Sequence, residues 1–203
     1  MAARRRPKAP RALLICCEGK TEEQYFNILL DFHRLPAYVE VEVYGQEGQH
    51  IALVDNTVAK REELCAGDDG LFEDEIECWA VCDEDKMPCS YTELKQYAEE
   101  RGVRLAFSAP QFEMYLLQHF EQSGETDKSI VFQKLSVHRR KHGGQGDYDD
   151  DTKADLDWMS DAIDHKPRIV DTAIVNSDIR SHTTKRPFLT VQELTKRIME
   201  LSI

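Results

Sequence analysis

Four short hydrophobic stretches in the first half of the chain have the pattern of β-strands. Residues 12–17 and 76–82 are almost continuously apolar, which favours strands of a parallel sheet covered on both faces. Residues 39–43 alternate valine with glutamate and predict a half-exposed strand. Residues 103–108 form a fourth run, which ends at Ala109-Pro110. The intervals between these runs are long enough for crossover helices.

Helical periodicity fills these intervals and continues to the end of the chain. Thr21 and Gln24 have the spacing of a capping box at the start of the first helix, and Ser90 and Glu93 repeat it at a later one, which Gly102 closes. Beyond residue 120 no strand is predicted. The predicted helices are 21–33, 51–64, 90–102, 111–120, 129–140, 153–163, 168–179 and 191–201.

The order of these elements predicts the fold class. Strands and helices alternate up to about residue 120, which indicates an α/β fold with a mostly parallel sheet flanked by helices. The helices that follow form a C-terminal extension. We therefore predict a basic tail over residues 1–10, an α/β domain over residues 11–120 and a helical extension over residues 121–203.

Composition and charge exclude several classes of protein. The chain has 203 residues, of which 41% are hydrophobic, and no apolar run approaches the ~20 residues that a membrane-spanning helix needs. We expect no membrane association and a cytoplasmic location. The six cysteines lack the spacing of a zinc site or a disulfide framework, which favours buried free thiols. A net charge of −12 argues against non-specific binding to duplex nucleic acid.

Three acidic residues stand where buried strands end. Glu18 follows the first run, and Asp83 and Asp85 follow the third. In an open α/β sheet the functional crevice lies beyond the carboxyl ends of the strands, so these carboxylates converge if the two strands are neighbours. Mg²⁺ prefers such oxygen ligands. A single acid at a strand end is more often a solvated group that favours the helix dipole, but the three together favour a metal site.

Three motifs in the chain resemble the RloB family, whose members are similar to TOPRIM-domain nucleases. The motifs are Cys17-Glu18-Gly19-Lys20-Thr21-Glu22, then Val81-Cys82-Asp83-Glu84-Asp85, then Ser108-Ala109-Pro110-Gln111-Phe112-Glu113 with Leu116, Leu117, His119 and Phe120. The resemblance implies a TOPRIM-like catalytic domain over residues 11–120. It also implies Mg²⁺ or Mn²⁺ as cofactor, with Asp83 and Asp85 as metal ligands and Glu18 as an acid/base or metal-adjacent carboxylate.

Two further carboxylates are linked to this site: Glu113 of the third motif and Glu22 of the first. The resemblance makes Glu113 a catalytic candidate, although a carboxylate in a first helical turn is favourable in any protein. Glu22, one turn after Glu18, is a weaker candidate. His119, beside Phe120, is more often a hydrogen-bonded core histidine than a functional one.

The densest basic stretch of the chain, residues 138–142, is a candidate phosphate contact. Arg139, Arg140 and Lys141, together with Lys20 of the first motif, are expected to bind substrate phosphates. The alternative is a solvated helix end. The acidic run over residues 147–151 fails the pattern of a calcium loop and is predicted to be a solvated loop.

The resemblance predicts a metal-dependent nuclease that hydrolyses nucleic-acid phosphodiester bonds. Because RloB-like proteins occur in bacterial defence loci, often beside an ATPase, the expected role is an anti-phage effector (abortive infection) with an ATPase partner. DNA and RNA are both candidate substrates, and a homo-oligomer is one candidate assembly. The alternative is a non-catalytic TOPRIM-like module that assembles with the ATPase. A primase-like polymerase is a weaker option.

Overall fold

The computed structural model describes residues 10–67, 70–181 and 186–202. Apart from Pro10, the predicted basic tail lies outside these residues. The chain forms a five-stranded sheet in the order β2-β1-β3-β4-β5, built from β1 (Ala12–Cys17), β2 (Glu40–Tyr44), β3 (Ile76–Asp83), β4 (Val103–Ala109) and β5 (Phe188–Leu189). The first four strands are parallel, and β5 pairs antiparallel with β4. The predicted α/β class with a mostly parallel sheet is confirmed.

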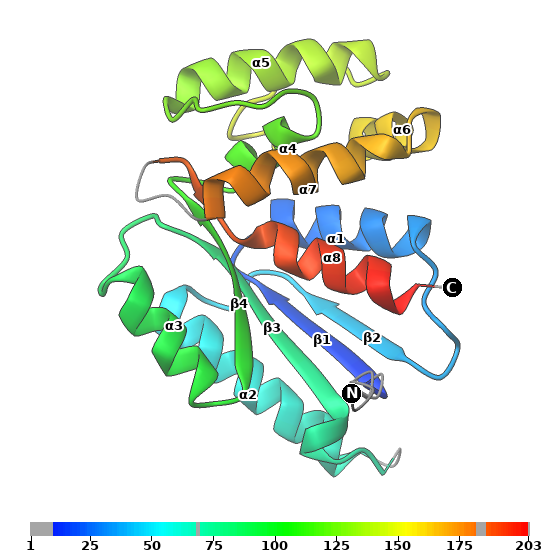
Figure 1. The fold of residues 1–203 in the computed structure, drawn as a ribbon, viewed down its shortest axis with the longest axis vertical. Coiled ribbons are helices and arrows are strands. Elements are labelled where there is room, and N and C mark those ends of the chain that lie inside the picture. Colours follow the sequence, from blue (N-terminus) through cyan, green and yellow to red (C-terminus); the bar gives the residue numbers. More distant parts are fainter. Residues whose placement is uncertain (1–9, 68–69, 182–185, 203) are drawn as a thin grey trace, which may run out of the picture.

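Helices cover both faces of the sheet (Figure 1). On one face lie α2 (His50–Ala66) and α3 (Tyr91–Glu99), and on the other lie α1 (Lys20–Phe32) and α8 (Val191–Leu201). Beyond α1 and α8 a further group of helices is stacked, which comprises α4 (Glu113–Gln118), α5 (Lys128–Lys141), α6 (Asp157–His165) and α7 (Arg168–Ser181).

The alternation of side chains along the strands divides the interior into two cores. In β1, Leu13, Ile15 and Cys17 point to the α1 side, whereas Leu14 and Cys16 point to the α2 side. Both faces of β1 are therefore apolar, and all six of its residues are buried. This burial explains why the strand appears in the sequence as a continuous hydrophobic run with no alternation.

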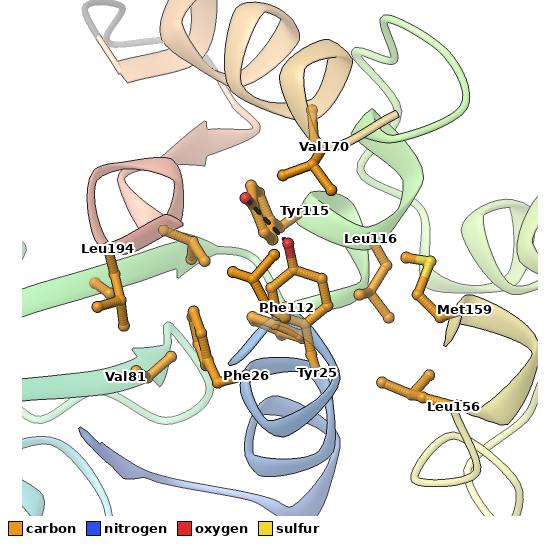
Figure 2. Close-up of a cluster of buried hydrophobic side chains, with 14 of the residues drawn as sticks. Tyr25, Phe26, Val81, Phe112, Tyr115, Leu116, Leu156, Met159, Val170 and Leu194 are labelled. Carbon is orange, nitrogen blue, oxygen red and sulfur yellow. Dashed lines mark hydrogen bonds between the residues drawn. The ribbon is translucent and has the colours of Figure 1, made fainter. Parts of the chain in front are cut away.

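The helices after residue 120 are part of the larger core. Figure 2 shows one cluster that includes Phe26 of α1, Phe112 just before α4, Val170 of α7 and Leu194 of α8. At the centre of this cluster the Tyr25 hydroxyl donates to the Tyr115 hydroxyl at 3.4 Å. The predicted boundary at residue 120 thus falls inside one continuous hydrophobic core, and the extension completes that core.

Three local predictions are wrong, each for a physical reason. The Thr21–Gln24 capping box is absent, because α1 begins at Lys20 behind Gly19, which has no side-chain cap. No strand was expected beyond residue 120, but β5 lies there; it has only two residues, too few for a periodic pattern. The helix predicted from Lys153 begins at Asp157. By contrast, the capping box of Ser90 and Glu93 is present at α3.

All six cysteines are free thiols in the structure. Cys16, Cys17, Cys78 and Cys82 are buried, and burial raises the pKa of each of these thiols. Cys65 and Cys89 are partly exposed. The prediction of buried free thiols holds for the four cysteines on β1 and β3. Over the described residues, no helix is long and apolar enough to cross a membrane.

Candidate functional site

The carboxyl ends of β1, β3 and β4 meet along one edge of the sheet. Strand β3 pairs with β1 on one side and with β4 on the other, both in parallel register. Glu18, Asp83 and Glu113, which lie at or just after the ends of these strands, consequently face one crevice, as does Asp85. Two adjoining cavities of about 420 and 530 Å³ form this crevice and share Asp83, Asp85 and Glu113 in their walls. The predicted convergence of the acidic residues is confirmed.

Glu18 is half-buried and has one free carboxylate oxygen. The side-chain amide of Gln49 donates to Glu18 Oε1 at 2.8 Å, whereas Glu18 Oε2 is buried and has no hydrogen-bond partner among the described residues. Burial, followed by the charge of Asp83, raises the pKa of Glu18 to about 7. A carboxyl group with this pKa can take up or release a proton near neutral pH.

Glu22 is more deeply buried than Glu18 and lies in the same crevice. Burial raises its pKa to about 8, and the charges of Glu113, Asp83 and Glu18 act in the same direction. Gly19 leaves the space for this carboxylate, because a Cβ atom at Gly19 would lie 2.8 Å from Glu22 Oε2. Glu22, only a weak candidate from the sequence, therefore belongs to the acidic wall of the crevice.

Asp83 is the central carboxylate of the crevice. Its Oδ1 accepts a hydrogen bond from the Asp85 backbone N–H at 2.9 Å, and the imidazole of His50 lies 3.1 Å from its backbone oxygen. Burial raises the pKa of Asp83, partly offset by the hydrogen bond from Asp85. Asp85 itself is exposed, in the turn that follows β3. The two aspartates therefore offer one inner and one outer carboxylate to the same space.

Glu113 begins α4 and is buried in the wall of the same crevice. The hydroxyl of Tyr148 lies 3.5 Å from Glu113 Oε1. Burial raises the pKa of Glu113, and the positive charge of Lys153 lowers it. His119, by contrast, is a core residue: its Nε2 is 3.0 Å from the Tyr25 hydroxyl, and burial lowers its pKa to about 4.

The basic residues that line the crevice differ from those expected. Lys20 lies in its wall as predicted, and Lys128 and Lys153, which the sequence did not single out, line it as well. Neither lysine belongs to a basic cluster in the sequence. Only their positions in the fold, at the start of α5 and in the loop before α6, bring them to the acidic residues.

Arg139 does not have the predicted role of a phosphate contact. It is buried, with 3% of its side chain exposed, and its guanidinium donates to the backbone oxygens of Gln145, Thr152 and Asp155 and to the Asp155 carboxylate at 2.6 Å. These bonds fix the loop between α5 and α6. Arg140 pairs with Asp147, and neither Arg140 nor Lys141 lines the crevice. Asp147 and Asp149–Asp151 are exposed, as predicted for a solvated loop.

The carboxylates of the crevice suit a divalent cation by their chemistry. In residues 10–67, 70–181 and 186–202, no group of three or more acidic, histidine or cysteine side chains is arranged to hold a metal ion. Glu18 Oε2 nevertheless has no hydrogen-bond partner among the described residues, and burial raises the pKa values of Glu18, Glu22, Asp83 and Glu113, so each carboxylate would gain from a cation beside it. Hard oxygen donors of this kind fit Mg²⁺ or Mn²⁺, which keep part of their water shell.

The fold and the crevice define an α/β protein with an acidic site at the carboxyl edge of its sheet. Residues 13–198 match the family described as RloB-like protein, so the chain belongs to the RloB-like family. No curated protein and no solved structure gives a match.

Proposed function

We propose that the protein is a metal-dependent nuclease of the TOPRIM type, which hydrolyses phosphodiester bonds of nucleic acid. One observation supports the proposal above the others: Glu18 and Asp83, at the ends of the adjacent strands β1 and β3, line one crevice with Glu113 of α4, and each has a raised pKa. Groups with shifted pKa values in a cleft are typical of active sites.

Each crevice residue has a role that follows from its position. Asp83 and Asp85 would hold Mg²⁺ or Mn²⁺, which when bound supplies Lewis-acid stabilisation of the phosphate oxygens. Glu18 would accept a proton from the attacking water, since its carboxyl group lines the crevice and its pKa of about 7 suits a general base near neutral pH. Glu113 adds a further carboxylate to the wall of the crevice, and Lys20 in the same wall is a contact for substrate phosphate.

Membership of the RloB-like family supports a wider biological proposal. On the resemblance described above, the nuclease acts as an anti-phage effector in the cytoplasm and works with an ATPase partner. The net charge of −12 agrees with a requirement for such a partner, because a free protein of this charge is repelled by nucleic acid.

A cleavage assay tests the activity. Purified protein is treated with EDTA and incubated with plasmid DNA, single-stranded DNA and transfer RNA, with Mg²⁺ or Mn²⁺ added back. We expect cleavage of at least one substrate, a loss of about 100-fold or more in Asp83→Asn and Glu18→Gln, and no loss in Glu62→Gln, an exposed glutamate on α2. Cleavage that persists in Asp83→Asn would contradict the site assignment.

The second candidate function, a non-catalytic module that assembles with an ATPase, is favoured by one observation. The described residues contain no preformed group of three metal ligands. Calorimetric titration with Mn²⁺ separates the two candidates. The nuclease binds Mn²⁺ in a manner that Asp83→Asn weakens, whereas a purely structural module shows no binding that depends on Asp83.

A further inference from the structure

Two lysines face the acidic crevice from different elements. Lys128 is the first residue of α5, and Lys153 lies in the loop before α6. Both line the cavity that contains Asp83, Asp85 and Glu113, and Lys153 also lines the cavity that contains Glu18.

Both lysines form ion pairs with one carboxylate of the protein itself. Lys128 Nζ is 2.7 Å from each carboxylate oxygen of Asp150, and Lys153 Nζ is 3.6 Å from Asp150 Oδ1. Asp150 belongs to the acidic loop and lies in the wall of the cavity that contains Glu18. A negatively charged group is therefore held between two cations at the edge of a site proposed to bind phosphodiesters.

The loop that carries Asp150 and Lys153 is fixed by buried side chains. The Arg139 guanidinium binds three of its backbone oxygens, and the hydroxyl of Tyr148 donates to the backbone oxygen of Lys153 at 3.3 Å. Tyr148 is buried and also contacts Glu113. The carbonyl groups of Lys153 and Asp155 bind side chains, and α6 begins only at Asp157. The position of Lys153 over the crevice is thus built into the fold.

We propose that Lys128 and Lys153 form the phosphate-binding pair of the crevice, and that the Asp150 carboxylate is an internal competitor for that pair. This inference rests on the proposed function, since it names the residues that hold a phosphodiester of a nucleic-acid strand at the same site. It replaces the stretch at residues 138–142 as the main phosphate contact.

The contact with Asp150 has the properties of a displaceable latch. The side chains of Asp150, Lys128 and Lys153 are 61%, 50% and 41% exposed, and ion pairs between exposed groups are weak. A phosphate brings the same charge to the lysines and displaces the carboxylate without breaking the buried anchors of the loop.

A role for Asp150 as a metal ligand predicts the opposite result. If Asp150 were a further ligand for the cation of the crevice, its removal would weaken Mn²⁺ binding and would not favour nucleic acid in the absence of metal. Binding measured in EDTA separates the two roles, because metal and cleavage are then excluded from the experiment.

The test is fluorescence anisotropy with a labelled 20-nucleotide single-stranded DNA and an RNA of the same sequence, in EDTA, over a series of salt concentrations. Asp150→Asn is expected to lower the Kd for at least one strand about 3-fold. Asp151→Asn, an exposed neighbour with the same change of charge, is expected to alter it less than about 1.5-fold. Lys128→Gln and Lys153→Gln are each expected to raise the Kd and to reduce the salt slope by about 0.7, whereas Lys141→Gln leaves both unchanged.

A combined variant shows whether the gain acts through the lysines. Asp150→Asn added to Lys128→Gln/Lys153→Gln should give no further gain. The proposal is overturned if neither strand binds Asp150→Asn at 50 mM salt, if Asp150→Asn equals Asp151→Asn, if the gain survives without the lysines, or if Lys141→Gln weakens binding as much as Lys153→Gln. A lysine-dependent gain without cleavage under any metal would instead support the phosphate pair and contradict the nuclease.

Discussion

The two ends of the same sheet treat acidic residues in opposite ways. At the amino end, Glu77 accepts hydrogen bonds from Arg104 at 3.0 Å and from Arg197 at 2.8 Å, and from the indole of Trp79. At the carboxyl end, Glu18, Glu22, Asp83 and Glu113 share a crevice in which their pKa values are raised. Both ends contain a cavity among the described residues, and at the carboxyl end Lys128 and Lys153 offset only part of the effect that burial has on the carboxylates.

This difference separates a site that stabilises the fold from one that we propose to be functional. A carboxylate paired with two arginines lowers the energy of the folded chain and offers little to a ligand. Buried carboxylates close to one another raise that energy, because each must lose water and repel its neighbours. Such a cost is expected where a ligand of opposite charge offsets it on binding, and the proposed ligand here is a divalent cation. The comparison therefore supports the carboxyl edge as the place of the proposed ligand site. Substitutions at either end of the sheet test it.

The largest effect on stability is expected from Glu22→Gln at alkaline pH. The folded pKa of Glu22, about 8, lies above the usual value of 4.5, so the folded state binds a proton that the unfolded state has lost. The cost of Glu22 is absent below pH 4.5, grows as the pH rises, and is complete above pH 8. Glu22→Gln should raise the free energy of unfolding by about 2–4 kcal/mol at pH 9 and by much less at pH 5.

Urea unfolding in EDTA at the two pH values measures this effect. Glu62→Gln, an exposed substitution of the same kind on α2, serves as the control and should change little at either pH. A loss of stability in Glu22→Gln at pH 9 would mean that the Glu22 carboxylate is favourably paired, and the contrast between the two ends of the sheet would fail.

A smaller effect of opposite sign is expected from Glu77→Ala at the amino end. The Arg197 side chain is 15% exposed, and the substitution removes its main partner together with the acceptor for Trp79. We expect a loss of about 2 kcal/mol in the free energy of unfolding, with Mn²⁺ binding unchanged. Glu200→Ala is the matched control, because Glu200 contacts Arg197 at 3.3 Å but is 67% exposed. If the two substitutions cost the same, the Glu77 cluster is not a stabilising site.

The sequence predicted the strands well because burial on both faces leaves a direct trace. The run Ala12–Cys17 matches β1 residue for residue, and the run from Ile76 identifies β3 to within one residue. The start of α6 could not be predicted in this way. Whether Lys153 lies in a helix depends on the buried Arg139 and Tyr148, and a charged residue in a sequence does not reveal its own burial.

Of the candidate site, the sequence predicted the carboxylates at the strand ends but not the lysines. Glu18, Asp83 and Asp85 mark the ends of buried strands, so the general rule for open α/β sheets brings them together. Lys128 and Lys153 enter the crevice from elements that follow the last parallel strand. No periodicity or motif connects them to it, and only the packing of α4 and α5 reveals the contact. The roles of all these residues in catalysis stay predictions.

The most direct test of the central claim is a crystal structure of the protein soaked in Mn²⁺, with the anomalous signal of the metal recorded. The account predicts a peak in the crevice at the carboxyl edge. The peak should lie within ligand distance of Asp83 and of either Glu18 or Asp85, and it should disappear in Asp83→Asn. A crevice without a peak at millimolar Mn²⁺, or a peak that persists in Asp83→Asn, would contradict the assignment of this edge as a metal-dependent site.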